Sequence, residues 1–220
     1  MPEYTRQTEE KDIDWFLDTV VVRDIGAVIE AGGGYLSFAL IAQSIEVIGA
    51  LLDEQEIDYY EQGLPAKRFD KAITEVFKPI DARYAEFNKE DSEYYLWENL
   101  RCGMAHIIRP KSKIVFTGKS DAIKLGASHL GKIKFDDGEE HLLLVVEDFY
   151  DHLKDACRRT KNKLPKKTHA KLKKGYITIH HVQQPSSLSH LLGGSATSPT
   201  LSGGGFDVPV TGVAPGTNQG

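Results

Sequence analysis

The stretch from Tyr35 to Leu52 constrains the fold more than any other part of the sequence. It is apolar on nearly every face, and its few interruptions are Ser37, Gln43, Ser44 and Glu46. A helix of this length is just long enough to span a bilayer, but Gln43 and Glu46 near its middle would cost several kcal/mol there. The stretch therefore predicts a central buried helix, in which the Glu46 carboxylate needs a structural partner such as a tyrosine or an arginine.

Apolar residues at helical spacing predict three more helices in the first half of the chain. They are expected at about residues 9–31, at 69–87 with a kink at Pro79, and after a candidate N-cap at Asp91-Ser92 up to about Ile108, where Pro110 ends the helix. Together with residues 35–52 they make four helices with short connections. This is the pattern of an antiparallel up-and-down bundle and places the chain in the mainly α class.

The hydrophobic period changes after Pro110. Ile114–Thr117 is a short β-type run, and Lys132–Phe135 alternates ahead of a turn and a second apolar run at Leu142–Val146. We therefore expect a small β-hairpin insertion at about residues 112–146, with a third strand if the first run joins it. A further helix is predicted from Asp148 toward Lys163, followed by a strand at Tyr176–Ile179.

The last part of the chain has a different composition. From Pro185 onward, 22 of 36 residues are Gly, Pro, Ser or Thr, and only one is charged. Such a segment buries too little apolar surface to order itself. The sequence thus predicts a helical domain at residues 1–184 and a flexible tail at residues 185–220.

Overall composition excludes several classes of protein. The chain is 40% hydrophobic and 27% charged, which is typical of a globular protein and not of a disordered, collagen-like or membrane-embedded one. Two cysteines and a polar, acidic N-terminus argue against a disulfide-rich secreted protein. A reducing, cytoplasmic location is expected, with no membrane partner.

Charge is distributed unevenly along the chain. The net charge of −5 is the sum of −13 over residues 1–100, +9 over residues 101–174 and −1 beyond them. Between Lys154 and Lys174, ten basic residues accompany a single acid, Asp155. Such a stretch can neutralise phosphates and give salt-sensitive nucleic-acid binding. Alternatively, its lysines and arginines complement a helix C-terminus or pair with the acidic half of the chain.

One segment carries residues suited to phosphate chemistry. Arg101 and His106 lie in an R-x-x-x-x-H spacing within the aromatic-rich run EYYLWENLRCGMAHIIRP. Histidine exchanges protons near neutral pH, and arginine stabilises charge on a phosphate without itself titrating. On an ideal helix five residues rotate by about 140°, so the two side chains converge only if the helix loosens or across a dimer interface.

The motif and the order of helices over roughly residues 9–163 resemble the HEPN superfamily of small helical-bundle proteins. The resemblance implies a homodimer in which two motifs face each other across one cleft. It further implies RNA cleavage without a metal or cofactor, by attack of the 2′-hydroxyl on the adjacent phosphate, as in toxin or defence ribonucleases with antitoxin-like protein partners. Arg101 and His106 would then be catalytic. The candidate RNA-backbone contacts are Arg109, Arg158, Arg159, Lys166, Lys167, Lys173 and Lys174.

A second hypothesis uses the same residues structurally. Arg101 would pair with a buried acid such as Glu46, and His106 would cap a helix C-terminus. The chain would then be a catalytically inactive helical module that dimerises and recruits a protein, or binds nucleic acid without cutting it.

Overall fold

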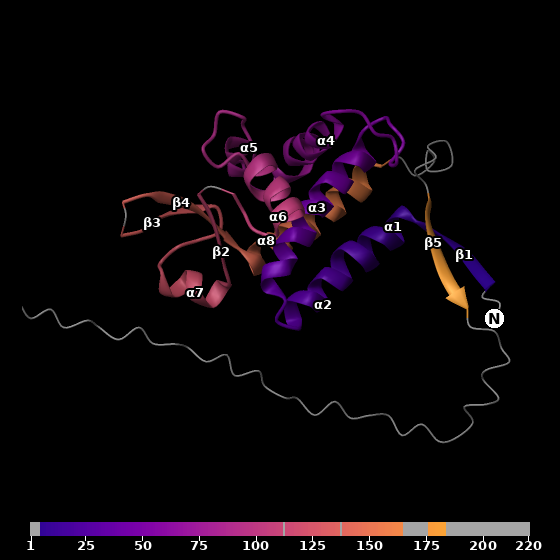
Figure 1. Cartoon of the computed structure of the whole chain (residues 1–220), viewed down its shortest axis with the longest axis horizontal. Coiled ribbons are helices and arrows are strands. Elements are labelled where there is room, and N and C mark those ends of the chain that lie inside the picture. Colours follow the sequence, from indigo (N-terminus) through magenta and orange to yellow (C-terminus); the bar gives the residue numbers. More distant parts are fainter. Residues whose placement is uncertain (1–4, 112, 137, 165–175, 184–220) are drawn as a thin grey trace, which may run out of the picture. The chain divides into compact units, whose positions relative to one another are not determined.

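The computed structural model describes residues 5–111, 113–136, 138–164 and 176–183. Nearly all of them belong to one compact unit, residues 7–181, and the second unit comprises residues 1–6 and 182–220. The fold is mainly helical with a small three-stranded sheet, which confirms the expected class (Figure 1). The predicted tail at residues 185–220 lies outside the part described.

The first helix begins later than its spacing predicts. Residues Thr5–Asp12 form strand β1, which pairs with β5 (Tyr176–Gln183), so the predicted start near Glu9 is wrong. The helix starts at Ile13 because the Asp12 carboxylate accepts a hydrogen bond from the Trp15 amide at 2.6 Å. It continues through three segments, which are α1 (Ile13–Trp15), the π-helical η1 (Phe16–Asp24) and α2 (Ile25–Glu30).

The predicted central helix is present as α3 (Gly34–Leu52). It runs through the middle of the helices in Figure 1, and Ile41, Ile45 and Ile48 are at most 1% exposed. Gly49 permits a close approach to the next helix, because a Cβ there would lie 1.7 Å from the Arg68 carbonyl oxygen. Among the residues described, α3 alone is long and apolar enough to cross a membrane, and 56% of it is buried in the fold.

Pro79 ends a helix and does not merely kink it. The helical segments α4 (Leu64–Ala72) and the π-helical η2 (Ile73–Phe77) stop before Lys78, and α5 (Arg83–Phe87) begins after a turn. Proline has no amide hydrogen and its ring clashes with the preceding turn, which explains the break. The predicted single helix at residues 69–87 is therefore two.

The motif-bearing helix consists of the π-helical η3 (Trp97–Cys102) followed by α6 (Gly103–Ile107). Its first amide, that of Trp97, donates to Asn88 Oδ1 at 3.1 Å, whereas Ser92 Oγ accepts from Tyr94 within the preceding turn. Ser92 is thus not the cap that the sequence predicts. The end of the helix is as expected, because Ile108 adopts a left-handed conformation two residues before Pro110.

The predicted β insertion is a three-stranded sheet in the order β2-β4-β3. Its strands are β2 (Ile114–Thr117), β3 (Gly131–Lys134) and β4 (Glu140–Val145). β3 and β4 form the expected antiparallel hairpin, and β2 joins β4 in parallel. One sheet face, with Ile114, Leu142 and Leu144, packs on the helical core.

One helix lies between β2 and β3 in the sequence, and another follows β4. The expected helix after β4 is α8 (Val146–Lys163), whereas α7 (Lys119–Lys124) has no counterpart in the sequence prediction. The first amide of α7, that of Lys119, donates to the Glu147 carboxylate of α8 at 2.8 Å. A residue distant in sequence thus caps this short helix, and Ala122 of α7 packs against Leu143 and Val145 of the sheet.

Candidate functional site

Arg101 of η3 forms an ion pair with Glu46 of α3. Arg101 Nη2 lies 2.5 Å from Glu46 Oε2, and the two side chains are only 16% and 19% exposed. The Arg101 guanidinium also lies over the Trp97 ring, 5.0 Å from its centroid. The ion pair matches the structural alternative drawn from the sequence and joins the motif-bearing helix to the core helix.

His106 and Arg109 lie apart from this ion pair. Both are exposed, and His106 is in the last turn of α6, near the negative end of the helix dipole. The chain after α6 folds back closely, since a Cβ on Gly103 would come within 2.6 Å of the Arg109 carbonyl oxygen. The structure therefore places Arg101 inside the protomer and His106 and Arg109 on its surface.

An apolar surface lies beside His106. Ile107 and Ile108 are 48% and 60% exposed, and the hydroxyl of Tyr35 at the start of α3 donates to the Ile108 carbonyl at 2.9 Å. Leu36 and Leu40, one helical turn apart on α3, are 54% and 40% exposed. The Tyr35 hydroxyl thus joins the end of α6 to the start of α3, where Leu36 and Leu40 are exposed.

The exposed apolar side of α3 continues into a groove of about 310 Å³ between α3 and the first helix. Leu40, Gln43 and Val47 supply the α3 side of the groove, and Phe16, Val20 and Val28 lie opposite. We call the surface formed by Leu36, Leu40, Gln43 and Val47 the α3 face. Successive positions in this set lie one turn apart, so all four share one side of the helix. No other helix of the described chain covers them fully, although α3 is its most apolar helix.

The basic stretch is largely engaged in ion pairs where the structure describes it. Arg158 and Arg159 both pair with Asp155, and Lys154 pairs with Asp151. Two more lysines reach other helices in the acidic half, Lys161 to Asp18 and Lys163 to Glu75. The alternative that basic residues pair with the acidic half thus holds for Lys161 and Lys163, whereas Lys154, Arg158 and Arg159 pair within α8 itself. The candidates Lys166, Lys167, Lys173 and Lys174 lie outside the described residues.

A buried polar chain that the sequence did not reveal links α5, the β3 region and α8. The Val145 amide donates to His129 Nδ1 at 3.0 Å, so the His129 proton is on Nε2, 2.8 Å from the Tyr84 hydroxyl oxygen. The Tyr84 hydroxyl in turn donates to His152 Nδ1 at 3.0 Å. Burial lowers the pKa of His129 to about 3, lowers the pKa of His152 and raises that of Tyr84. Tyr84 is fully buried, so this hydrogen-bonded network stabilises the core and gives a substrate no access.

No family model, curated protein or solved structure matches this chain. The site must therefore be interpreted from its own residues. Within the described ranges, no group of three or more His, Cys, Asp or Glu side chains could hold a metal ion. The structure brings Arg101 and Glu46 together as an ion pair and leaves His106 on the surface, apart from it.

Proposed function

We propose that this protein is a HEPN-like helical binding module that works as a homodimer and does not cut RNA. The uncovered α3 face carries the proposal. A helix of this hydropathy exposes a stripe of leucine and valine only at a free-energy cost of about 25 cal/mol per Å² of apolar surface, which a partner removes by covering it.

A second copy of the chain fits the α3 face. Of its side chains, Leu36 and Leu40 are exposed, Gln43 and Val47 are half-buried, and none of the four is charged. Two copies related by a two-fold axis bury leucine against leucine in a self-complementary contact, and the charged residue that lines the adjoining groove is the exposed Asp24. The groove beside Leu40 provides a recess for a side chain of the partner.

The Arg101–Glu46 ion pair supports the absence of catalysis. A guanidinium that binds a phosphate must present free donors to it, and that of Arg101 is mostly buried, between Glu46 and Trp97. Breaking the ion pair to reach a substrate would leave the Glu46 carboxylate without its partner in a mostly buried site. A structural role for Arg101 is the better account of its environment.

Substitution of Leu40 by glutamate tests the dimer. We expect the wild-type protein to sediment as a dimer and Leu40→Glu to weaken association by about 100-fold or more, because the charge would be buried at the centre of the contact. Ile123→Glu is the matched control, since Ile123 is 70% exposed on α7, away from the α3 face. A monomeric wild-type protein, or equal association of both variants, would contradict the proposal.

A metal-independent endoribonuclease is the second candidate, favoured by the position of His106. This histidine and Arg109 are exposed on either side of Ile107 and Ile108 in the sequence, and the Ile108 carbonyl accepts a hydrogen bond from Tyr35 at the start of α3. A dimer whose two-fold axis passed near this end of α3 would bring the two copies of His106 toward each other. His106 would then move the proton of the attacking 2′-hydroxyl, and an arginine would stabilise the phosphate.

An RNA-cleavage assay in the presence of a chelator separates the two candidates. We expect no cleavage by the purified wild-type protein, and accordingly no difference from Arg101→Ala or His106→Ala. Cleavage by the wild type that falls by about 100-fold or more in His106→Ala would establish the endoribonuclease. Ile123→Glu again controls for a nonspecific surface change.

A further inference from the structure

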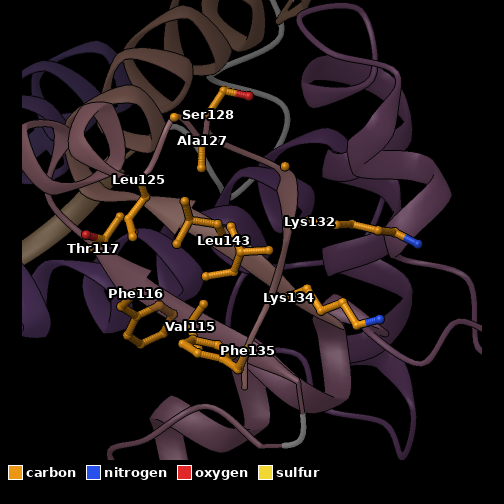
Figure 2. Close-up of a pocket in the computed structure, with 13 residues that line it drawn as sticks. Val115, Phe116, Thr117, Leu125, Ala127, Ser128, Lys132, Lys134, Phe135 and Leu143 are labelled. Carbon is orange, nitrogen blue, oxygen red and sulfur yellow. The ribbon is translucent and has the colours of Figure 1, made fainter. Parts of the chain in front are cut away.

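The sheet face turned away from the helical core is hollow beside β3. A cavity of about 580 Å³ lies there, with Val115, Ile133 and Leu143 among its lining residues (Figure 2). Leu125 and Phe135 also line it and are 62% and 45% exposed. The helix α7 buries Val145 and Leu143 at one end of this face. The remainder is a recess open to solvent, with apolar side chains on its floor and Thr117 and Ser128 also in its lining.

The outer edge of β3 borders this recess. β3 is an edge strand, because the sheet order is β2-β4-β3. Ile133 pairs with His141, and the Phe135 amide donates to the Glu139 carbonyl at 3.1 Å. Hydrogen-bonded positions alternate in an antiparallel ladder, so the amides and carbonyls of Lys132 and Lys134 point away from β4. They present donors and acceptors to an additional strand.

The positive charges of Lys132 and Lys134 determine which kind of strand can pair with the free edge of β3. Lys132 and Lys134 extend to the other side of the strand from Val115 and Leu143 in Figure 2. The ammonium of Lys132 lies 3.9 Å from Glu140 and 5.1 Å from the centroid of the Tyr94 ring, and that of Lys134 forms no ion pair with a residue that the structure describes. A second β3 paired at this edge would bring lysines against lysines, which disfavours self-association there. Acidic side chains fit the same positions.

We propose that the β3 edge and its recess bind an extended segment of another protein whose side chains alternate between acidic and apolar. Its backbone hydrogen-bonds to Lys132 and Lys134 and adds a strand to the sheet. Its apolar side chains enter the recess, and its acidic side chains pair with the lysines on the opposite face. The inference rests on the proposed binding function but uses a different surface from the α3 face, so peptide binding and dimerisation are measured separately.

Fluorescence anisotropy with defined peptides tests the proposal on the full chain. The probe is a fluorescein-labelled peptide of alternating glutamate and valine, and the control peptide has lysine in place of glutamate. We expect the acidic peptide to bind at least about tenfold more tightly. N-methylation of the peptide amides that face β3 removes the strand-forming donors and is expected to abolish binding.

Two pairs of variants locate the site. Lys134→Pro removes an outward amide that β4 does not use, and Lys134→Ala removes only the side chain, so binding should weaken about tenfold more in the proline variant. Leu125→Ser alters the wall of the recess, whereas Ile123→Ser alters an exposed residue of α7 that does not line it. We expect weaker binding only for Leu125→Ser.

Several outcomes would overturn the proposal. They are no binding of the acidic peptide at millimolar concentration, equal binding of the two peptides, or equal binding of the N-methylated peptide. Binding that responds to Leu40→Glu and not to Leu125→Ser would assign the peptide to the α3 face instead. If Lys134→Pro fails to fold, as judged by circular dichroism, the Leu125 and Ile123 variants and the N-methylated peptide still decide the question.

Discussion

Replacement of Arg68 by leucine is expected to lower the free energy of unfolding by about 3–4 kcal/mol. Arg68 is 6% exposed, and its guanidinium organises the whole connection between α3 and α4. Its Nε donates to Asp53 Oδ2 at 2.7 Å, and its two terminal nitrogens donate to the carbonyls of Glu56 and Ile57 at 2.7 and 3.0 Å. Without the guanidinium, these carbonyls lose their donors and the Asp53 carboxylate loses its cation.

Urea denaturation followed by circular dichroism measures this loss. Lys67→Leu is the matched control, because Lys67 is the exposed neighbour of Arg68 on α4 and should change stability by less than about 0.5 kcal/mol. Arg68→Lys keeps the charge but not the planar group that reaches several acceptors, so we expect a loss close to that of leucine. A lysine variant as stable as the wild type would show that charge alone holds the connection.

Acidification from about pH 6.5 to 5 is expected to destabilise the fold by ~2 kcal/mol through His129. Burial holds the pKa of His129 at about 3, below the ordinary value of 6.5. The unfolded chain therefore binds a proton that the folded chain rejects. The contribution of His129 to stability is complete above about pH 6.5 and is lost as the pH falls toward 3. Protonation would also place a hydrogen on Nδ1, against the amide of Val145.

His129→Phe isolates this contribution. The variant should be less stable than the wild type at pH 7.5, because the Val145 amide and Tyr84 hydroxyl lose a partner, but its stability should fall less between pH 6.5 and 5. His106→Gln, which removes an exposed imidazole, is the control and should keep the wild-type acid loss. Urea denaturation across this pH range is the measurement. An unchanged slope in His129→Phe would assign the acid sensitivity elsewhere.

Local sequence patterns predicted the helices well where burial and spacing alone determine them. The core helix is found where an unbroken apolar stretch predicts it, as α3 (Gly34–Leu52), because a helix that is apolar all round must be buried. The β3–β4 hairpin was predicted from the alternation of apolar residues on either side of a turn, and α8 from apolar residues at helical spacing. The errors near Glu9 and Ser92 arise because a different residue, Asp12 or Asn88, supplies the hydrogen bond at the start of the helix. At Pro79 the missing amide hydrogen and the ring break the helix, and α7 was not predicted at all.

The candidate site could be predicted only in part. The motif residues and the partner of Glu46 were among the sequence-based alternatives, but the choice between a free and a paired Arg101 depends on how η3 packs against α3. The pairing of α8 lysines with Asp18 and Glu75 likewise joins distant helices. The net charge of residues 101–174 predicted a basic surface. The ion pairs of α8 show that the basic residues between Lys154 and Lys163 each pair with an acidic side chain.

The spacing of apolar residues is enough to predict the mainly helical class, the core helix α3 and the hairpin, because it encodes which faces leave water. Features whose cause lies elsewhere in the chain follow only from the way the helices and strands pack. Glu147 of α8 caps α7, and Tyr84 joins two histidines that are 45 and 68 residues away in sequence. The physical reason is that burial follows from local periodicity, whereas the partner of a buried polar group depends on which helices and strands meet.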